Sequence, residues 1–243
     1  MGVCAQLLVP EAATDDAPVV FLHGWGGSAA GTWLASRLPG RLQVKGRSCL
    51  LIDLPGHGVS ARLAGASHNS EDYDSIVELV DEGLPEGGPF DIVGFSLGAK
   101  IGLTLAARRP ERVRRLVAAG VGSNLFSIEP SGVDVCTILR SGVTADSPAR
   151  PRQSAIYAMQ SGGDPEAMGA CLTRNWQPPT PAELRSISSP VLLAAGDQDE
   201  IVGSVDRLAE CLPQARVHRL RHIDHLATPY AAELHELIVD FLI

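Results

Sequence analysis

The sequence feature that most constrains the fold is a serine flanked by glycines, Gly-Phe-Ser-Leu-Gly at residues 94–98. Ile92 and Val93 precede it as a short apolar run that suits a buried strand, and residues 97–108 carry apolar and small side chains at helical spacing. The two glycines remove the Cβ atoms that would collide where a strand turns sharply into a helix. We therefore expect Ser96 to project its hydroxyl from the end of a sheet.

Apolar runs and turn residues predict an alternation of strands and helices along much of the chain. The expected strands are residues 3–9, 18–23, 49–52, 113–119, 190–195 and 215–220. The expected helices are residues 28–38, 67–84, 203–212 and 229–243, with a turn around Pro39 and Gly40. This order of elements favours one α/β domain with a mostly parallel sheet.

The serine motif, with a strand before it and a helix after it, resembles the nucleophile elbow of the α/β-hydrolase superfamily. On its own the motif also fits an ordinary Gly-Ser turn, so the interpretation depends on the rest of the chain. The resemblance implies an α/β-hydrolase fold with a mostly parallel, eight-stranded sheet, helices on both faces and a small helical cap. It also implies that Ser96 is the nucleophile.

Length and charge narrow the classes of protein that fit. With 243 residues and 45% hydrophobic side chains, the chain can bury the core of one large domain. Its formal charge of -8 argues against nucleic-acid or anionic-membrane partners, because both attract basic surfaces. Neither a signal peptide nor a membrane-spanning run is evident, so we expect a soluble, cytoplasmic protein whose scattered cysteines are reduced thiols.

A glycine-rich loop follows the apolar run at residues 18–23, and it reads His23-Gly24-Trp25-Gly26-Gly27. Glycines there let main-chain N–H groups face a cavity. In the family that this stretch resembles, the residue after His-Gly donates one N–H to an oxyanion, and that residue is Trp25. The second donor in the family follows the nucleophile, and here it is Leu97. The resemblance gives His23 a structural role.

Residues 53–60, Asp-Leu-Pro-Gly-His-Gly-Val-Ser, resemble another loop of the family. Asp53 and His57 in isolation suggest an acid-base pair. Their glycine-rich setting favours a shaped turn instead. This loop is therefore interpreted as a signature of the fold.

The alternation of strands and helices fails from residue 122 to residue 186, where prolines separate short apolar groups. We expect residues 1–121 and 187–243 to form the hydrolase core and residues 122–186 to form a helical cap. In the resembling family the cap covers the nucleophile and selects the substrate. Packing within the cap and contact with an apolar substrate both explain the candidate pocket residues, which are Phe126, Tyr157 and Trp176. The cap arginines suit a substrate carboxylate or solvent, and they are Arg140, Arg152 and Arg174.

A serine hydroxyl needs an imidazole to accept its proton and a carboxylate to orient that imidazole. The family order is serine, acid, histidine. Residues 196–202 resemble the family's Gly-x-x-Asp-x-x-Val loop, which assigns the acid to Asp199 and leaves Asp197 as the alternative. His225 matches the family's histidine in the loop of residues 221–229. His222 stands where the family often has glycine, which leaves the register open.

The predicted site uses no metal, because no His-Glu-x-x-His or comparable ligand spacing is present, and it needs no cofactor. We expect a serine hydrolase that cleaves a small carboxylic ester, lactone or thioester through an acyl-enzyme. The same triad also fits a C–C bond hydrolase or a lyase acting on a small anionic ketone or carboxylate, or a perhydrolase. A different alternative is a non-catalytic small-molecule receptor, because fold alone does not settle function.

Overall fold

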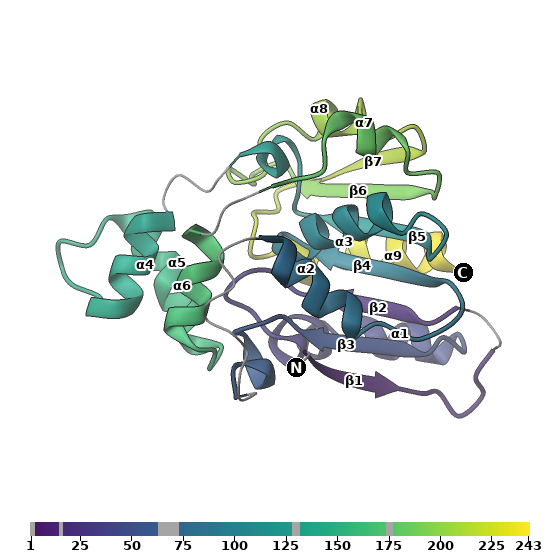
Figure 1. Ribbon diagram of the computed structural model, residues 1–243, viewed down its shortest axis with the longest axis horizontal. Helices are drawn as coiled ribbons and strands as arrows, with labels where there is room; N and C mark the ends of the chain where they lie inside the picture. Colours follow the sequence, from purple (N-terminus) through teal and green to yellow (C-terminus); the bar gives the residue numbers. More distant parts are fainter. Residues whose placement is uncertain (1–2, 15–16, 63–72, 128–131, 174–176) are drawn as a thin grey trace.

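The computed structural model describes residues 3–14, 17–62, 73–127, 132–173 and 177–243. Seven strands form one sheet in the order β1-β3-β2-β4-β5-β6-β7 (Figure 1). The edge strand β1 is antiparallel to β3, and the other neighbouring strands are parallel. The strands are β1 (Cys4–Leu8), β2 (Val19–Leu22), β3 (Cys49–Asp53), β4 (Phe90–Phe95), β5 (Val113–Ala119), β6 (Val191–Gly196) and β7 (Ala215–Leu220).

Helices cover both faces of the sheet, because side chains alternate along each buried strand. Val20 and Leu22 face one apolar core, and Val19 and Phe21 face the other. The first core is closed by α2 (Tyr73–Glu82), α3 (Leu97–Arg108), α7 (Pro181–Arg185) and α8 (Val205–Ala209). The second is closed by η1 (Ala29–Leu34), α1 (Leu38–Val44) and α9 (Ala232–Leu242). The predicted α/β-hydrolase architecture is confirmed. The resemblance implied about eight strands, but the described residues form seven, because a single antiparallel strand begins the sheet.

The turn predicted around Pro39 and Gly40 is wrong, because both residues lie in the first turn of α1. Proline is accepted there since its missing N–H would have no partner inside the helix. The helical path breaks earlier, at Arg37, whose φ is 61°. The other short helical turns are η2 (Gly58–Arg62), η3 (Ser123–Phe126) and η4 (Thr228–Tyr230).

Three helices, α4 (Gly132–Ser141), α5 (Ala149–Gln160) and α6 (Pro165–Thr173), form a group that we call the helical layer. The layer lies beyond one end of the sheet, at the left in Figure 1. It has a small core of its own, made of Val135, Ile138, Leu139, Ala155, Ala158 and Met168. That residues 122–186 act as a separate cap stays a prediction.

Strand register brings two loops together at the edge of the sheet that faces the helical layer. Leu22, the last residue of β2, lies beside Gly94 near the end of β4. The loop that begins at His23 and the turn that carries Ser96 therefore leave the sheet side by side. Parallel strands place their carboxyl ends at one edge, where α/β proteins commonly bind ligands.

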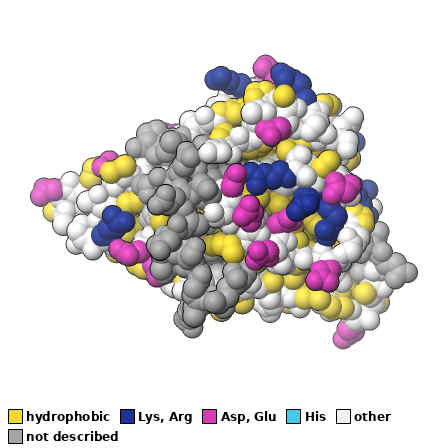
Figure 2. Space-filling model, in the orientation of Figure 1, with side chains coloured by type: hydrophobic (Ala, Val, Ile, Leu, Met, Phe, Trp, Pro, Cys, Tyr) yellow, Lys and Arg dark blue, Asp and Glu magenta, His cyan; other side chains and the backbone are white. Residues whose placement is uncertain are grey.

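The face over α2 and α3 carries basic and acidic side chains next to one another (Figure 2). Arg108 lies 2.5 Å from Asp74, and Arg109 lies 2.9 Å from Asp81. Pairing of opposite charges at this surface leaves it without a large field of either sign. Within the described ranges, no helix is both long enough and apolar enough to cross a bilayer.

Candidate active site

The turn between β4 and α3 places Ser96 in a conformation that ordinary residues avoid, with φ 51° and ψ -112°. A Cβ atom at Gly94 would lie 2.6 Å from the carbonyl oxygen of Gly98, and one at Gly98 would lie 2.3 Å from that of Leu22. Both distances are far below van der Waals contact, so only glycine fits at these positions. The N–H of Ser96 donates to the carbonyl of Ala119 at 2.8 Å, which fixes the turn against β5.

A chain of hydrogen bonds joins Ser96, His225 and Asp199. Oγ of Ser96 lies 2.9 Å from Nε2 of His225, and Nδ1 of His225 lies 2.6 Å from Oδ2 of Asp199. The Asp199 side chain is fully buried and that of His225 is 12% exposed. The arrangement fits the tautomer in which Nδ1–H donates to the carboxylate and Nε2 accepts from the serine hydroxyl. The structure thus brings the three predicted residues together.

The loop after β6 holds the two candidate acids in different surroundings. Oδ1 of Asp199 accepts the main-chain N–H groups of Ile201 and Val202 at 2.9 and 3.3 Å, which leaves Oδ2 for the imidazole. Asp197 is exposed, and its Oδ1 accepts the N–H of His222 at 2.7 Å. Of the two acids, Asp199 is the one in contact with His225.

His222, the alternative histidine, is an exposed residue with φ 58°. This left-handed conformation is the one that glycine adopts without strain, which explains why glycine suits the position. Two other histidines also lie elsewhere. His218 contacts Glu233 at 2.7 Å, and His235 is buried and contacts the carbonyl of Pro229 at 2.9 Å.

Two main-chain N–H groups, those of Trp25 and Leu97, are the predicted oxyanion donors. The described residues offer neither of them a main-chain acceptor. Leu97 is the first residue of α3, where the partial positive charge of a helix N-terminus favours a nearby anion. Trp25 lies in the glycine-rich loop beside the elbow, because β2 and β4 are neighbours in the sheet. Both residues line the cavity that contains Ser96.

His23 holds this loop against the next one. Its Nδ1–H donates to the carbonyl of Gly24 at 2.8 Å, and its Nε2 accepts the N–H of Leu54 at 3.0 Å. Complete burial lowers the pKa of His23 to about 4, so the imidazole is neutral at ordinary pH. Its two nitrogens therefore serve as one fixed donor and one fixed acceptor.

Comparison with known proteins agrees with this geometry. Residues 17–133 match the protein family described as the alpha/beta hydrolase fold. The chain has the α/β-hydrolase fold. The matching stretch of this α/β hydrolase includes Ser96 and both residues with candidate oxyanion donors, and it ends before Asp199 and His225.

Several relatives are similar over most of this α/β hydrolase. It is 28% identical to the pimeloyl-[acyl-carrier protein] methyl ester esterase of Nitrosomonas europaea, over 88% of this chain and 91% of that protein. It is 28% identical to the 2-hydroxymuconate semialdehyde hydrolase of Pseudomonas sp., over 93% of this chain and 86% of that protein. A carboxylesterase structure from the thaumarchaeon Nitrososphaera gargenis shares the fold, with a TM-score of 0.78, 16% identity, and coverage of 99% of this chain and 93% of that one.

The Asp53 loop of this α/β hydrolase is a shaped turn, as the sequence predicts. Oδ1 of Asp53 accepts the N–H of Ala29 at 2.7 Å, and Oδ2 accepts the N–H of Val59 at 2.8 Å. Nδ1 of His57 contacts the carbonyl of Pro55 at 2.9 Å. These bonds tie β3 to the start of η1 and leave the acid and the imidazole with separate main-chain partners.

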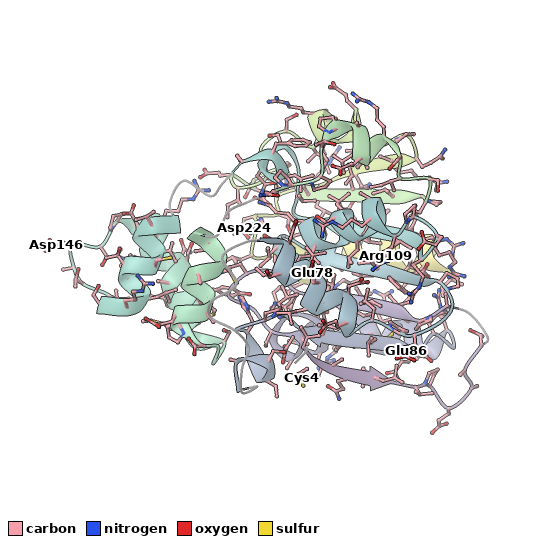
Figure 3. All side chains as sticks on the ribbon, in the orientation of Figure 1. Cys4, Glu78, Glu86, Arg109, Asp146 and Asp224 are labelled. Carbon is pink, nitrogen blue, oxygen red and sulfur yellow. The ribbon has the colours of Figure 1, made fainter. Side chains whose placement is uncertain are left out.

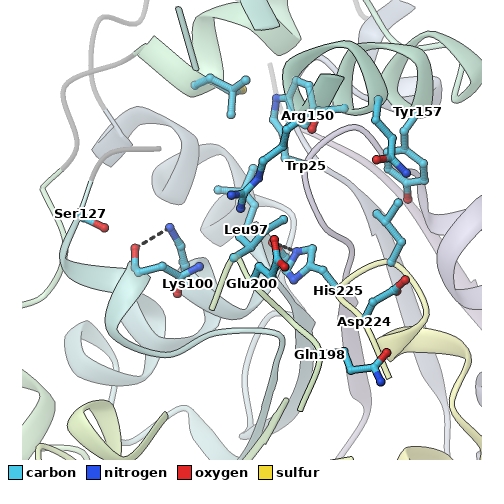
Figure 4. Close-up of a pocket in the computed structure, with 18 of the residues that line it drawn as sticks. Trp25, Leu97, Lys100, Ser127, Arg150, Tyr157, Gln198, Glu200, Asp224 and His225 are labelled. Atoms are coloured by element: carbon cyan, nitrogen blue, oxygen red, sulfur yellow. Dashed lines mark hydrogen bonds between the residues drawn. The ribbon is translucent and has the colours of Figure 1, made fainter. Parts of the chain in front are cut away.

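A cavity of about 520 Å³ lies over Ser96 (Figure 4). Its walls come from the glycine-rich loop, α3, α5, α6 and the loops after β6 and β7. Figure 3 shows Asp224, one of the lining residues, between the helical layer and the sheet, and Asp146 at the far tip of that layer. The described lining residues are Trp25, Ser96, Leu97, Lys100, Asn124, Ser127, Ala149, Arg150, Gln153, Ser154, Tyr157, Cys171, Leu172, Gln198, Glu200, Ile201, Asp224, His225 and Leu226.

The three predicted substrate-contacting residues lie in different places. Tyr157 lines the cavity, and burial raises the pKa of its phenol. Phe126 packs against the core beneath α3 and is absent from the described lining. Trp176 falls outside the described residues.

The structure adds two cationic side chains that the sequence analysis did not select. Lys100 follows Ser96 by one helical turn and lines the cavity, and Arg150 extends toward it from α5 (Figure 4). The position of Lys100 was available from the spacing, because residues four apart share a helix face. Of the cap arginines that were predicted, Arg140 lies 3.8 Å from Glu166 at the surface, and Arg174 is outside the described residues.

The part of the chain that the structure describes contains no group of three or more histidine, cysteine or acidic side chains placed to hold a metal ion.

Proposed function

We propose that this α/β hydrolase is a serine esterase that cleaves a small carboxylic ester through an acyl-enzyme. The observation that carries the proposal is the unbroken series of hydrogen bonds from Asp199 through His225 to Ser96 at the floor of the cavity. The named activities of relatives similar over most of the chain, among them a methyl ester esterase, support an ester as substrate.

In the proposed reaction, Ser96 Oγ attacks the ester carbonyl carbon while its proton passes to Nε2 of His225. Asp199 keeps the imidazole in the required tautomer and stabilises its charged form. The N–H groups of Trp25 and Leu97 donate to the carbonyl oxygen as it becomes an oxyanion. The imidazolium then protonates the departing alcohol, and His225 activates a water molecule that releases the acid and restores Ser96.

Residues 122–186 act as the cap in this proposal. Residues of α5 and α6 line the cavity above Ser96, and Trp25 links the cavity to the apolar core of the helical layer. Tyr157 and Leu172 give that wall an apolar part, whereas Gln153 and Ser154 make it polar. A lining of this mixed character suits an ester of modest size that carries polar groups.

A second candidate function is cleavage of a carbon–carbon bond in an anionic ketone. Lys100 and Arg150 place two cationic groups at the cavity, and a cationic group favours an anionic substrate. The 2-hydroxymuconate semialdehyde hydrolase relative supports this alternative by its name. The acidic side chains of Glu200 and Asp224 line the same cavity and reduce the net field, so the ester remains the first proposal.

The test is hydrolysis of p-nitrophenyl esters of increasing acyl length by the wild type, Ser96→Ala and Ser186→Ala. Loss of the nucleophile can lower kcat by roughly a million-fold in a serine hydrolase, and we expect a loss of that order for Ser96→Ala. Ser186 is the matched control, because its hydroxyl is exposed and donates to the local carbonyl of Glu183. Full turnover in Ser96→Ala would refute the proposal.

A phosphonate that labels active-site serines separates the two candidates. Wild-type protein that is labelled at Ser96 but hydrolyses none of the esters would favour the carbon–carbon substrate. Protein that is neither labelled nor active would favour the non-catalytic receptor.

A further inference from the structure

The glycine-rich loop that carries one candidate oxyanion donor contains one residue with a side chain larger than a hydrogen atom, Trp25. Its residues are Gly24, Trp25, Gly26 and Gly27. Gly26 has φ 74°, and glycine loses more conformational freedom on ordering than any other residue. A peptide plane in such a loop is set by what holds it from outside. The Trp25 N–H lies in one peptide plane with the Gly24 carbonyl, which accepts Nδ1–H of His23 at 2.8 Å and the N–H of Gly27 at 3.1 Å. The side chain of Trp25 holds the other end of this peptide.

That side chain is bonded to the helical layer. Nε1–H of Trp25 donates to the main-chain carbonyl of Met168 in α6 at 2.8 Å. Its ring packs against the sheet core beneath α3 and also against the core of the helical layer. Met168 is fully buried, so its surroundings hold the acceptor in place. Trp25 thus links the oxyanion loop to α6 by both packing and a directed bond.

Neighbouring contacts hold α6 against the Asp53 loop and α5 against the glycine-rich loop. The N–H of Asp164, just before α6, donates to the carbonyl of Gly56 at 3.0 Å. A Cβ atom at Gly26 would lie 3.1 Å from the Tyr157 ring and 3.2 Å from Cβ of Ala158, both in α5. Helix α5 therefore fits tightly over the glycine-rich loop, and α6 is held on the Asp53 loop, which His23 bonds to the glycine-rich loop.

The other candidate donor is fixed in a different way. Leu97 belongs to α3, whose hydrogen-bonded backbone is packed on β4 and β5. The N–H of Leu97 therefore keeps its direction even if the helical layer changes position. The Trp25 N–H instead takes its direction from the bonds on the Gly24 carbonyl and from the anchor of its own indole.

We infer that the indole of Trp25 is a positioning group. Through its bond to Met168 of α6, and together with the two bonds on the Gly24 carbonyl, it aims the Trp25 main-chain N–H at the oxyanion. Full alignment of this N–H then requires α6 to be seated over the loop. This inference rests on the proposed serine mechanism and adds a specific residue pair to it. Loss of the bond lowers stabilisation of the tetrahedral intermediate more than it lowers substrate binding.

The test compares Trp25→Phe with Trp33→Phe. Phenylalanine keeps an aromatic ring at position 25 and removes the N–H that reaches Met168. Trp33 is a buried tryptophan of η1 in the opposite core, and its Nε1 has no acceptor among the described residues, so it is the control for loss of an indole. We expect Trp25→Phe to lower kcat by about 10-fold to 100-fold with KM within about three-fold, less than the roughly 100-fold to 1000-fold cost of deleting an oxyanion donor.

Two inhibitors supply a readout that a purely structural role would not change. A medium-chain alkyl trifluoromethyl ketone forms a reversible bond between its carbonyl carbon and Ser96 Oγ. The serine proton moves to His225, and the carbonyl electron pair leaves a negative oxygen in the oxyanion site. The alkyl methyl ketone of the same chain length serves as the ground-state ligand. We expect Trp25→Phe to weaken the fluorinated ketone by the same factor as kcat/KM and to leave the methyl ketone within about two-fold.

A second variant covers the case in which Trp25→Phe does not fold. Genetic incorporation of 3-benzothienylalanine at position 25 keeps the shape of the indole and replaces its N–H by sulfur. Wild-type kcat and ketone affinity in either folded variant would overturn the inference, as would an equal loss of affinity for both ketones. Activity that survives Ser96→Ala would instead refute the serine mechanism itself.

Discussion

Two histidines of this α/β hydrolase lie near an aspartate, and their surroundings differ in one respect. Nε2 of His23 is 3.8 Å from Oδ1 of Asp53, but both ring nitrogens of His23 are bonded to main-chain groups. The ring nitrogens of His225 contact two side chains, Asp199 and Ser96. One imidazole holds two loops in place, and the other connects a buried carboxylate to a hydroxyl at a cavity.

The chemistry of the partners explains the difference in role. At ordinary pH a main-chain N–H does not release its proton, and a carbonyl oxygen does not become protonated. An imidazole that is hydrogen-bonded to both groups therefore stays in one tautomer. A hydroxyl beside Nε2 has a proton to give when it attacks, and a carboxylate beside Nδ1 stabilises the resulting positive ring. Proximity to an acid is therefore common to both histidines, and the nature of the two partners is what supports the proposed role of His225.

The largest effect that tests this comparison is expected from Asp199→Asn. The asparagine oxygen would keep the bonds from the N–H groups of Ile201 and Val202, and its amide would face Nδ1 of His225 as a donor. The imidazole would then carry its proton on Nε2 and could not accept from Ser96. We expect kcat for ester hydrolysis to fall by about 10⁴-fold, the cost of the wrong tautomer in a serine protease.

The matched control is Asp197→Asn in the same loop. Asparagine can still accept the N–H of His222 at this exposed position, so we expect kcat within about three-fold of wild type. Steady-state kinetics of the two variants, with circular dichroism to verify folding, make the measurement. A larger loss for Asp197→Asn than for Asp199→Asn would reverse the assignment of the acid.

A smaller effect, on stability, is expected at His23. Its pKa is lowered to about 4 in the fold by burial, against 6.5 for the free side chain. Between these values the unfolded chain binds a proton that the folded chain does not, so stability is present above the unfolded pKa and is lost as the pH falls toward 4. For this one group, we expect a loss of unfolding free energy on the order of 2 kcal/mol between about pH 7.5 and about pH 5.

Urea unfolding of the wild type and of His23→Gln at the two pH values measures this contribution. Glutamine provides an oxygen that can accept the N–H of Leu54 but takes up no proton in this range. The wild type should therefore lose about 2 kcal/mol more than the variant between the two pH values. Equal losses would show that His23 is not a neutral, buried anchor.

Much of the fold follows from local patterns in the sequence. The apolar runs at residues 18–23 and 49–52 became β2 and β3 almost without change, because a strand buried on both faces needs an unbroken apolar run. The strand expected at residues 113–119, which includes Arg114 and Arg115, became β5. The helix at residues 97–108 was also placed correctly. The turn predicted around Pro39 was wrong, because proline is found in the first turn of a helix as well as after a helix end. Here the positive φ of Arg37 breaks the helical path, and Pro39 lies in the first turn of α1.

Within the candidate site, the residues on short motifs were predictable and the cavity wall was not. Ser96, Asp199 and His225 each follow a strand at a fixed offset, so sheet geometry brings them to one edge. The position of the cavity wall depends instead on how α5 and α6 pack, and the shapes of their side chains decide that packing. Phe126 was predicted to contact substrate and lies against the core, while Arg150 was not predicted and lines the cavity.

The smallest effect is expected at His222, the neighbour that could be mistaken for His225. His222 is exposed and has φ 58°, a conformation that costs an ordinary residue roughly 1 kcal/mol relative to glycine. The N–H that it donates to Asp197 belongs to the main chain and is kept by any residue except proline.

We expect His222→Gly to be more stable than His222→Ala by about 1 kcal/mol. Both variants should retain kcat within about two-fold. Urea unfolding and ester hydrolysis on the pair provide the two readouts. A loss of activity in both variants comparable to that of Asp199→Asn would move the catalytic role from His225 to His222.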